Sequence, residues 1–374
     1  MRHVLIVTGQ HFATSPRKVD LHFIADVLSK RGDHVDFLSL RLSWVSRLSK
    51  DGRFKFARQR PLNRWTTVSP RTDEYIWYTP FHLMNLRNTA LNQVSGRVFK
   101  LLGSHLPFAV RQRLPSYTDI VIESGQGPLV TAEIRALAPN ARIIYHAADR
   151  LSTIGSHPAI QKVFETTIDD YDLVHIVAES LQADIPPGPP VVYLPHGISK
   201  QAFDTATNPY RTPHNVVSVG DMLFDARAVA ILAGANPDWT FHLFGKKAFL
   251  DPSPANVVAH GEVPFEEVVG YIKFADIGVA PYLESGNAEY LSQSSLKLIQ
   301  YTYCRLPIVA PVFAATGRDH VQGYAPDNEA SLQAAFDKAV SYDRTTIDTA
   351  TALSWEEKTE ALFSSAPVSS ASTD

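Results

Sequence analysis

The sequence is poor in cysteine and has no long apolar run. Its single cysteine is Cys304, which excludes an intrachain disulfide framework and favours a reducing compartment. No stretch approaches the roughly 18–20 apolar residues that a membrane-spanning helix needs. The apolar part of the start, MRHVLIVTG, is too short for a secretory signal peptide. We therefore expect a protein that is soluble or lies on a membrane surface.

Several ligand-binding signatures are also missing. No Walker A sequence occurs, and no G-x-G-x-x-G follows an apolar run. Histidine and cysteine are not clustered at zinc-binding spacings, and Asp170-Tyr171-Asp172 reads as a solvated turn rather than a metal site. A Glu-x7-Glu pattern, common in retaining two-domain sugar transferases, is replaced by Ser292 and Gln300. The sequence therefore predicts no bound metal.

What the chain does have is alternation of short apolar runs with helical patterns, which predicts parallel sheets covered by helices. The fold class is α/β, with two doubly wound, Rossmann-like domains facing a central cleft. We expect domains at 1–200 and 201–350, a polar linker at Ser199–His214, and a C-terminal region (351–374) whose helix crosses back to the first domain and ends in a disordered tail. The expected strands are His3–Thr8, Val35–Leu40, Ile120–Ser124, Arg142–His146, Leu173–Ala178, Val191–Pro195, Val216–Val219, Thr240–Phe244, Val257–Ala259, Ile277–Ala280 and Ile308–Pro311.

The segment Gly278–Pro311 is the most informative part of the chain. It reads as a strand end, a polar loop, an amphipathic helix and a second strand. Hydroxyls at Ser292–Ser295 cap the helix, and Lys297 and Gln300 follow within its first turns. A helix N-terminus with a nearby cation suits a phosphate, and doubly wound sheets hold nucleotides at such strand ends. The segment predicts a nucleotide site, although a lysine one turn into a helix is often simply solvated.

Three further loops carry candidate residues after predicted strands. In Gly220-Asp221-Met222, the glycine would let the backbone approach a pyrophosphate and Met222 would lie against a base or ribose; a plain strand–helix turn is the alternative. Glu262 could accept hydrogen bonds from a nucleobase or ribose. Asp149 follows the strand that ends near His146, where a carboxylate could act as a general base. The alternative for Asp149 is an N-cap of the next helix.

Positive charge is concentrated in one region. From Arg41 to Arg113 there are fourteen lysines and arginines against three acidic residues, although the whole chain has a formal charge of −3. Aromatic and aliphatic residues interleave with these cations at Leu42–Arg60 and at Val94–Leu102. This pattern favours an anionic membrane surface and a lipid-diphosphate acceptor. A basic face over an ordinary core is the alternative, and no nucleic-acid-binding module is visible.

The runs TGQHFATSPRKVDLHFI, IESG, YHAADRLSTI, VGDMLFD, GYIKFADIGVAPY and SSLKLIQY resemble the GumK-type glucuronosyltransferases of xanthan assembly. The resemblance implies a GT-B fold and a membrane-associated, inverting enzyme. Asp149 matches the family's catalytic base, and the positions that match its UDP-binding residues are Met222, Glu262, Tyr282, Lys297 and Gln300. The chain departs from the family at His146, where an arginine is usual, and at Arg150, where a small residue is usual. Arg150 is thus a candidate partner for the donor carboxylate.

From the resemblance we expect an inverting transferase that moves glucuronate from UDP-glucuronate to a polyprenyl-diphosphate-linked oligosaccharide, forming a β-glycosidic bond in bacterial exopolysaccharide biosynthesis. The UDP-sugar is a substrate, and no cofactor or metal is expected. The expected location is the cytoplasmic face of the inner membrane, peripherally bound, with no nucleic-acid partner. Three alternatives remain open: a transferase for another UDP-sugar, a UDP-sugar epimerase of the same architecture, or a non-catalytic adaptor at the membrane surface.

Overall fold

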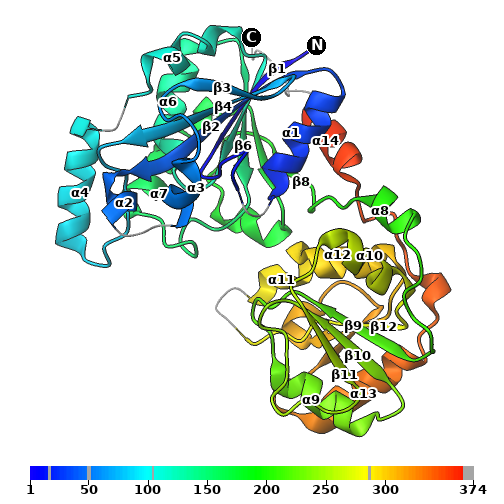
Figure 1. Cartoon of the computed structure of the whole chain (residues 1–374). Coiled ribbons are helices and arrows are strands. Elements are labelled where there is room, and N and C mark those ends of the chain that lie inside the picture. The colour runs from blue at the N-terminus through cyan, green and yellow to red at the C-terminus, as the bar shows by residue number, and fades with distance from the viewer. Residues whose placement is uncertain (16–17, 49–51, 103–104, 285–287, 365–374) are drawn as a thin grey trace, which may run out of the picture. The chain divides into compact units, whose positions relative to one another are not determined.

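The computed structural model describes residues 1–15, 18–48, 52–102, 105–284 and 288–364. The chain forms two compact units (Figure 1): Met1–Leu194 together with Thr359–Asp374, and Pro195–Lys358. Each unit is a sheet covered by helices on both faces. The predicted α/β class with two Rossmann-like units is confirmed. The expected disordered tail, from 365 on, lies outside the described residues.

The first unit contains an eight-stranded sheet with the order β3-β4-β2-β1-β5-β6-β7-β8. All neighbouring strands are parallel except β3 and β4, which are antiparallel. The strands are β1 (His3–Thr8), β2 (His34–Ser43), β3 (Trp65–Ser69), β4 (Thr72–Thr79), β5 (Asp119–Glu123), β6 (Arg142–Ala147), β7 (Leu173–Ile176) and β8 (Val191–Tyr193). The helices are α1 (Asp20–Lys30), α2 (Trp44–Leu48), α3 (Gly52–Ala57), α4 (Thr89–Leu102), α5 (Phe108–Arg111), η1 (Leu114–Ser116), α6 (Pro128–Leu137), α7 (Pro158–Thr166), η2 (Ile168–Asp170) and η3 (Glu179–Asp184).

The core of this unit lies on both faces of its central strands. The run Val4–Val7 is fully buried, as expected for parallel strands covered on two sides. On one face, Ile144 belongs to the cluster formed with α1 and with the last helix of the chain, α14 (Trp355–Ser364). Its neighbour Tyr145 points to the opposite face and stacks on Phe164 of α7, with ring centroids 4.3 Å apart. Successive residues of β6 therefore serve two separate helix layers.

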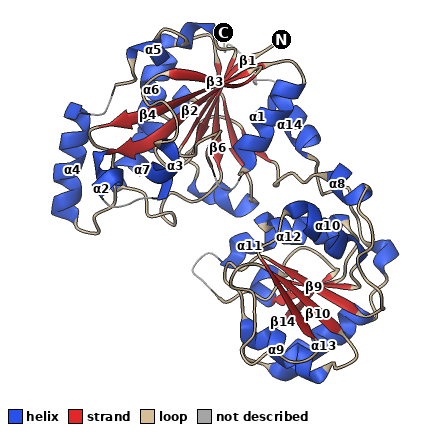
Figure 2. Cartoon of the chain, in the orientation of Figure 1, coloured by secondary structure: helices blue, strands red, loops and turns tan. Residues whose placement is uncertain are grey.

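The second unit contains a six-stranded parallel sheet with the order β11-β10-β9-β12-β13-β14, shown in red in Figure 2. Counted within the unit, this is the order 3-2-1-4-5-6 of dinucleotide-binding folds. The strands are β9 (Asn215–Val219), β10 (Thr240–Phe244), β11 (Val257–Gly261), β12 (Ile277–Val279), β13 (Ile308–Pro311) and β14 (Val321–Tyr324). The helices are α8 (Lys200–Asp204), α9 (Ala226–Ala235), α10 (Phe265–Phe274), α11 (Ala288–Ser294), α12 (Leu296–Tyr303), η4 (Val312–Ala314), α13 (Glu329–Val340) and η5 (Arg344–Thr346).

Neighbouring residues of β9 separate the two cores of this unit. Val216 packs with α9 and α13, whereas Val217 packs with α8, α10 and α12. Because side chains alternate along a strand, a single apolar run supplies both layers. The carboxyl ends of all six strands then lie along one edge of the sheet, which places their following loops together.

Three of the expected strands have the predicted bounds, namely β1, β10 and β13. Strands β3, β4 and β14 were not predicted, because polar residues such as Glu74 interrupt their apolar pattern. Glu74 is nevertheless 2 % exposed and accepts a hydrogen bond from Phe12 N at 2.6 Å. The segment Ser199–His214 is not a free linker. It contains α8, and its Phe203 and Tyr210 pack against the core of the second unit.

Candidate active site

The second unit has a topological switch point between β9 and β12. From β9 the chain proceeds to β10 on one side, and later returns to β12 on the other. Ligands of doubly wound sheets bind outside the carboxyl ends of the strands at such a point, because the loops diverge there. Here one diverging loop begins with Gly220 directly after β9, and the other, which begins at Ala280 after β12, contains Pro281-Tyr282.

Gly220 brings backbone and a lysine side chain together at this point. Its φ of +86° lies in the left-handed region that favours glycine. A Cβ at this position would lie 3.8 Å from Lys297 Cε and 3.9 Å from Lys297 Nζ. The turn is also fixed from the side, since Asp221 Oδ2 accepts a hydrogen bond from Lys247 N at 3.0 Å. The ammonium group of Lys297 therefore lies directly beside the glycine turn.

Lys297 is held in place by the start of α12. Ser295 is the N-cap of this helix, and its Oγ accepts a hydrogen bond from Leu298 N at 3.4 Å, as the predicted capping hydroxyls require. The same Oγ lies 2.5 Å from the hydroxyl of Tyr282, whose ring centroid is 4.7 Å from Lys297 Nζ. Burial lowers the pKa of Lys297 to about 7, opposed in part by the carboxylate of Asp221. Burial thus disfavours the protonated form of Lys297, and an anionic ligand beside the ammonium group would favour it again.

The other predicted nucleotide-binding residues lie around this centre at different distances. Met222 is two residues beyond Gly220, with 69 % of its surface exposed. Gln300 lies on α12, three residues after Lys297, and is buried. Glu262 is exposed just beyond β11, two strands from β9, which corresponds to roughly 10 Å at the usual strand spacing. Lys297 and Tyr282 touch one another, whereas Glu262 could meet only a ligand that extends along the edge of the sheet.

The first unit has its own switch point, between β1 and β5, and it carries a residue that was not predicted. Glu123 ends β5, and its Oε2 accepts hydrogen bonds from the hydroxyl of Thr8 and from Gly9 N, the latter at 3.2 Å. Burial raises the pKa of Glu123, the two hydrogen bonds lower it in part, and the nearby carboxylate of Asp149 raises it. The resulting pKa is about 7. A carboxylate that directly follows a buried apolar run, as in IVIE, is the sequence signal that would have found it.

Asp149 lies two residues beyond β6, in an exposed loop. The next helix, α7, begins at Pro158 and has His157 as its N-cap, so the alternative role of Asp149 as that helix's cap is wrong. Arg150 has an acid partner in its own unit: its Nε lies 2.9 Å from Asp184 Oδ2. The loop therefore presents the carboxylate of Asp149 to solvent near the switch point that Glu123 occupies.

Solved structures with the same architecture share little sequence with this chain, so the comparison with them concerns only the fold. The α,α-trehalose-phosphate synthase (UDP-forming) of Burkholderia xenovorans superposes with a TM-score of 0.56 at 11 % identity, covering 95 % of each chain. A putative UDP-N-acetylglucosamine 2-epimerase from Listeria monocytogenes gives 0.53 at 7 % identity, covering 97 % of this chain and 95 % of its own. Each unit is therefore of the kind found in GT-B glycosyltransferases, and the fold by itself does not separate a transferase from an epimerase.

Sequence similarity is more specific. Residues 6–177 match the family described as Glucuronosyltransferase GumK, N-terminal domain. The UDP-glucuronate:glycolipid 2-beta-glucuronosyltransferase of Xanthomonas campestris pv. campestris is 31 % identical over 367 residues, which cover 97 % of this chain and 90 % of the relative. The similarity thus extends over both units. The chain belongs to the GumK glucuronosyltransferase family.

Proposed function

We propose that this protein transfers glucuronate from UDP-glucuronate to a polyprenyl-diphosphate-linked oligosaccharide in exopolysaccharide biosynthesis, with inversion to a β-glycosidic bond. One observation carries the nucleotide part of the proposal: Lys297 lies beside the Gly220 turn, over Tyr282 and in the first turn of α12, at the switch point of the sheet. The donor and the glycolipid class of acceptor follow from the activity named for the relative in Xanthomonas.

In this reaction Asp149 takes the proton from the acceptor hydroxyl as its oxygen attacks the anomeric carbon. The bond between that carbon and the β-phosphate oxygen breaks, and UDP leaves with one additional negative charge. Lys297 and the N-terminus of α12 stabilise this charge where it develops. These groups supply the electrostatic stabilisation that a metal ion provides in other transferases, so we propose that the transfer needs no metal or other cofactor.

A lipid-linked acceptor lies in the membrane. We propose that the first unit binds the membrane surface peripherally, at its cytoplasmic face. Support comes from α2, where Trp44 is 55 % and Leu48 is 78 % exposed and the guanidinium of Arg47 lies 5.7 Å from the Trp44 ring. On α4, Leu91 and Val94 are also more than half exposed. Over the described ranges, no helix combines the length and hydrophobicity needed to cross a bilayer.

The structure also narrows the predicted membrane-binding segment. Leu42 is 1 % exposed and belongs to a small core with Ala57 and Ile76, so it is not available to lipid. Arg60 lies 3.9 Å from the buried carboxylate of Glu74 and serves the fold. Within Leu42–Arg60, only the lysines and arginines that are not used by the fold would contact anionic headgroups.

The decisive experiment incubates the full-length protein with labelled UDP-glucuronate and a lipid-linked oligosaccharide acceptor. Label that moves to the lipid fraction, with a β-anomeric signal in the product, is the expected result. An isomerised donor without transfer would identify an epimerase, and neither product from any UDP-sugar tested would identify the adaptor. Treatment with EDTA should leave the rate unchanged, and a rate restored only by added divalent metal would refute the metal-independent mechanism.

Membrane binding is tested separately by co-sedimentation with vesicles. Binding should require anionic lipid and weaken as salt rises, because each Lys or Arg near such a surface contributes about 1 kcal/mol that ions screen. Replacing Arg47, Arg53 and Lys55 by serine should reduce it. Equal binding to neutral and anionic vesicles, or none to either, would contradict the electrostatic attachment.

A further inference from the structure

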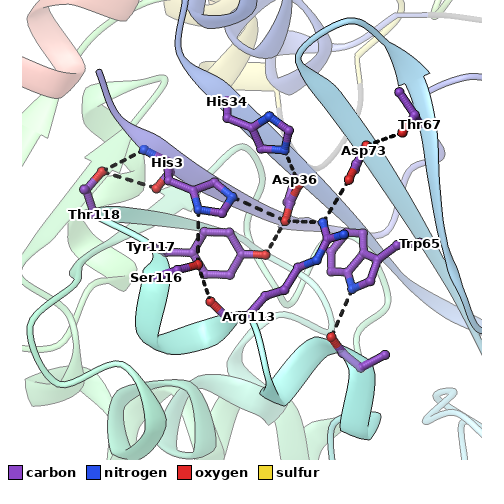
Figure 3. Close-up of polar contacts among 11 residues, drawn as sticks. His3, His34, Asp36, Trp65, Thr67, Asp73, Arg113, Ser116, Tyr117 and Thr118 are labelled. Carbon is purple, nitrogen blue, oxygen red and sulfur yellow. Dashed lines mark hydrogen bonds and ion pairs between the residues drawn. The ribbon is translucent and has the colours of Figure 1, made fainter.

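A cluster of two histidines and an aspartate lies at the amino ends of β1 and β2. The parallel register places His3 opposite His34, and Asp36 follows two residues later on the same face of β2. Each of the three residues offers one ligand atom, a ring nitrogen or a carboxylate oxygen, and these three atoms lie within 4.8 Å of one another. The sequence did not predict this cluster, because the two histidines are separated by a helix and meet only through strand pairing (Figure 3).

The hydrogen bonds around His3 define which of its nitrogens carries a proton. Ser116 Oγ donates to the carbonyl oxygen of Arg113 at 2.7 Å, so its single hydrogen is used. The contact of 3.1 Å between Ser116 Oγ and His3 Nδ1 is then donated by the imidazole. In the neutral ring, His3 Nε2 consequently carries the lone pair.

That lone pair faces a carboxylate. His3 Nε2 is buried and, within the described part of the chain, makes no hydrogen bond. The carboxylate oxygen Asp36 Oδ2 lies 3.5 Å away, and Asp36 Oδ1 lies 3.1 Å from His34 Nε2. A lone pair and a carboxylate oxygen at this separation repel one another unless a positive charge lies between them, supplied either by a proton on His3 Nε2 or by a bound cation.

The neighbouring arginine does not supply that charge. Arg113 Nη1 contacts Asp36 Oδ2 and Asp73 Oδ2, each at 2.9 Å, and its guanidinium lies 4.3 Å from the Trp65 ring. Figure 3 shows His3 and Arg113 on opposite sides of the Asp36 carboxylate. One arginine shared by the carboxylates of Asp36 and Asp73 leaves a net negative charge. The imidazoles of His3 and His34 contact Asp36 away from Arg113.

We propose that His3, His34 and Asp36 form a structural zinc site. Two imidazoles and one carboxylate are a common zinc ligand set. With bonds of about 2.0–2.1 Å, tetrahedral ligand atoms lie roughly 3.3–3.5 Å apart. His3 Nε2 lies 3.5 Å from Asp36 Oδ2 and His34 Nε2 lies 3.1 Å from Asp36 Oδ1, so each imidazole meets its own carboxylate oxygen at a distance close to this spacing. Ser116, Arg113 and Tyr117, whose hydroxyl donates to Asp36 at 2.5 Å, orient the ligands as outer partners do at zinc sites.

The position of the site indicates its role. His3 begins β1 and Thr8, which contacts Glu123, ends it; the two ends of such a strand are roughly 16 Å apart. A zinc ion here would join the starts of β1 and β2 and the segment before β5, away from the reacting groups. With 28 % of the His3 side chain and 38 % of the His34 side chain exposed, the ion can enter from solvent. It would stabilise the first unit without affecting transfer.

The test uses full-length protein without a histidine tag, first treated with EDTA and dialysed. Titration with zinc in competition with a chromophoric chelator should show one saturable site, and Co²⁺ should give the intense visible absorption of a tetrahedral complex. His34→Gln and His3→Gln should each lower zinc affinity at least tenfold and abolish the increase in melting temperature that zinc produces. His105→Gln, at a histidine whose side chain is 85 % exposed outside the cluster, should behave as the wild type.

Circular dichroism would show that the variants are folded. No saturable binding of zinc by the wild type would overturn the proposal, as would binding that His34→Gln and His3→Gln leave unchanged. Loss of glucuronate transfer from the zinc-free enzyme would contradict the structural role. None of these results bears on the identity of the sugar donor, so this proposal and the proposed transferase function fail independently.

Discussion

Binding of UDP should become strongly dependent on pH above neutrality, because the cation that would meet the diphosphate is not fully charged in the free protein. Burial lowers the pKa of Lys297 to about 7. A diphosphate beside the ammonium favours the protonated form and raises this pKa on binding. The proton must therefore be taken up as UDP binds at alkaline pH, and affinity should fall as the proton becomes scarcer.

The size of the effect follows from the lowered pKa. At pH 8 about one molecule in ten carries a charged Lys297, so binding should take up about 0.9 protons. Between pH 7.5 and 9.5 the affinity should fall about 75-fold, or about 2.5 kcal/mol, if the pKa in the complex lies above this range. The terminal phosphate of UDP, with a pKa of about 6, is already ionised there. Burial also lowers the pKa values of His242 and His260 in this unit, which removes them from the same range.

Isothermal titration calorimetry measures this uptake directly when UDP is titrated at pH 8 in buffers of different ionisation enthalpy. Lys297→Met, which keeps most of the length of the side chain and removes its ammonium group, should bind UDP more weakly near pH 7 and show no comparable uptake. Lys247→Met is the matched control, since this neighbouring lysine is exposed, and its slope with pH should equal that of the wild type. An affinity that changes less than twofold from pH 7.5 to 9.5, or proton uptake that persists in Lys297→Met, would refute the reasoning.

Three other predictions follow from the first unit. Asp149→Asn should lower the transfer rate about 10²–10⁴-fold with UDP affinity nearly unchanged; a variant with more than about a tenth of the wild-type rate would exclude Asp149 as the base. The folded-state pKa of Glu123, about 7 against 4.5, means that the folded protein keeps a proton that the unfolded chain loses, so the free energy of unfolding should fall by up to about 3 kcal/mol as pH rises from 4.5 to 7. Denaturant titrations should show this component missing in Glu123→Gln, and an unchanged pH dependence would contradict it. Trp44→Ser with Leu48→Ser should weaken vesicle binding at high salt more than at low salt, because it removes the apolar rather than the charged contribution; equal losses at both salt concentrations would argue against insertion.

Apolar runs predicted the strands whose residues are buried on both faces, because such strands need no alternation with polar residues. The edge strand β3 and its neighbour β4 did not follow this rule. Their pattern contains Asp73 and Glu74, and Glu74 is buried only because Phe12 N and Ala13 N donate to it from a loop some 60 residues away. Tertiary contacts of this kind leave no local signal in a sequence.

The same distinction holds for the sites. Lys297, Ser295 and Gly220 could be predicted because each follows a strand or begins a helix, so a parallel sheet brings them to one edge. The separation of Glu262 from Lys297 could not be predicted, because it depends on the order of the strands in the sheet. His3 and His34 were missed for a related reason: their proximity depends on the register of β1 against β2.

The last helix of the chain has a consequence for biosynthesis. Residues 195–358 are continuous in sequence, so their unit needs no later segment of the chain to complete its core. The first unit, although it is made earlier, lacks Leu362 and Phe363 until the end of α14 has left the ribosome. Domains synthesised first generally fold first, but here the order should be reversed. Until then the face of the first sheet toward α1 lacks part of its cover, and a nascent chain stalled before Trp355 would expose it to chaperones or proteases.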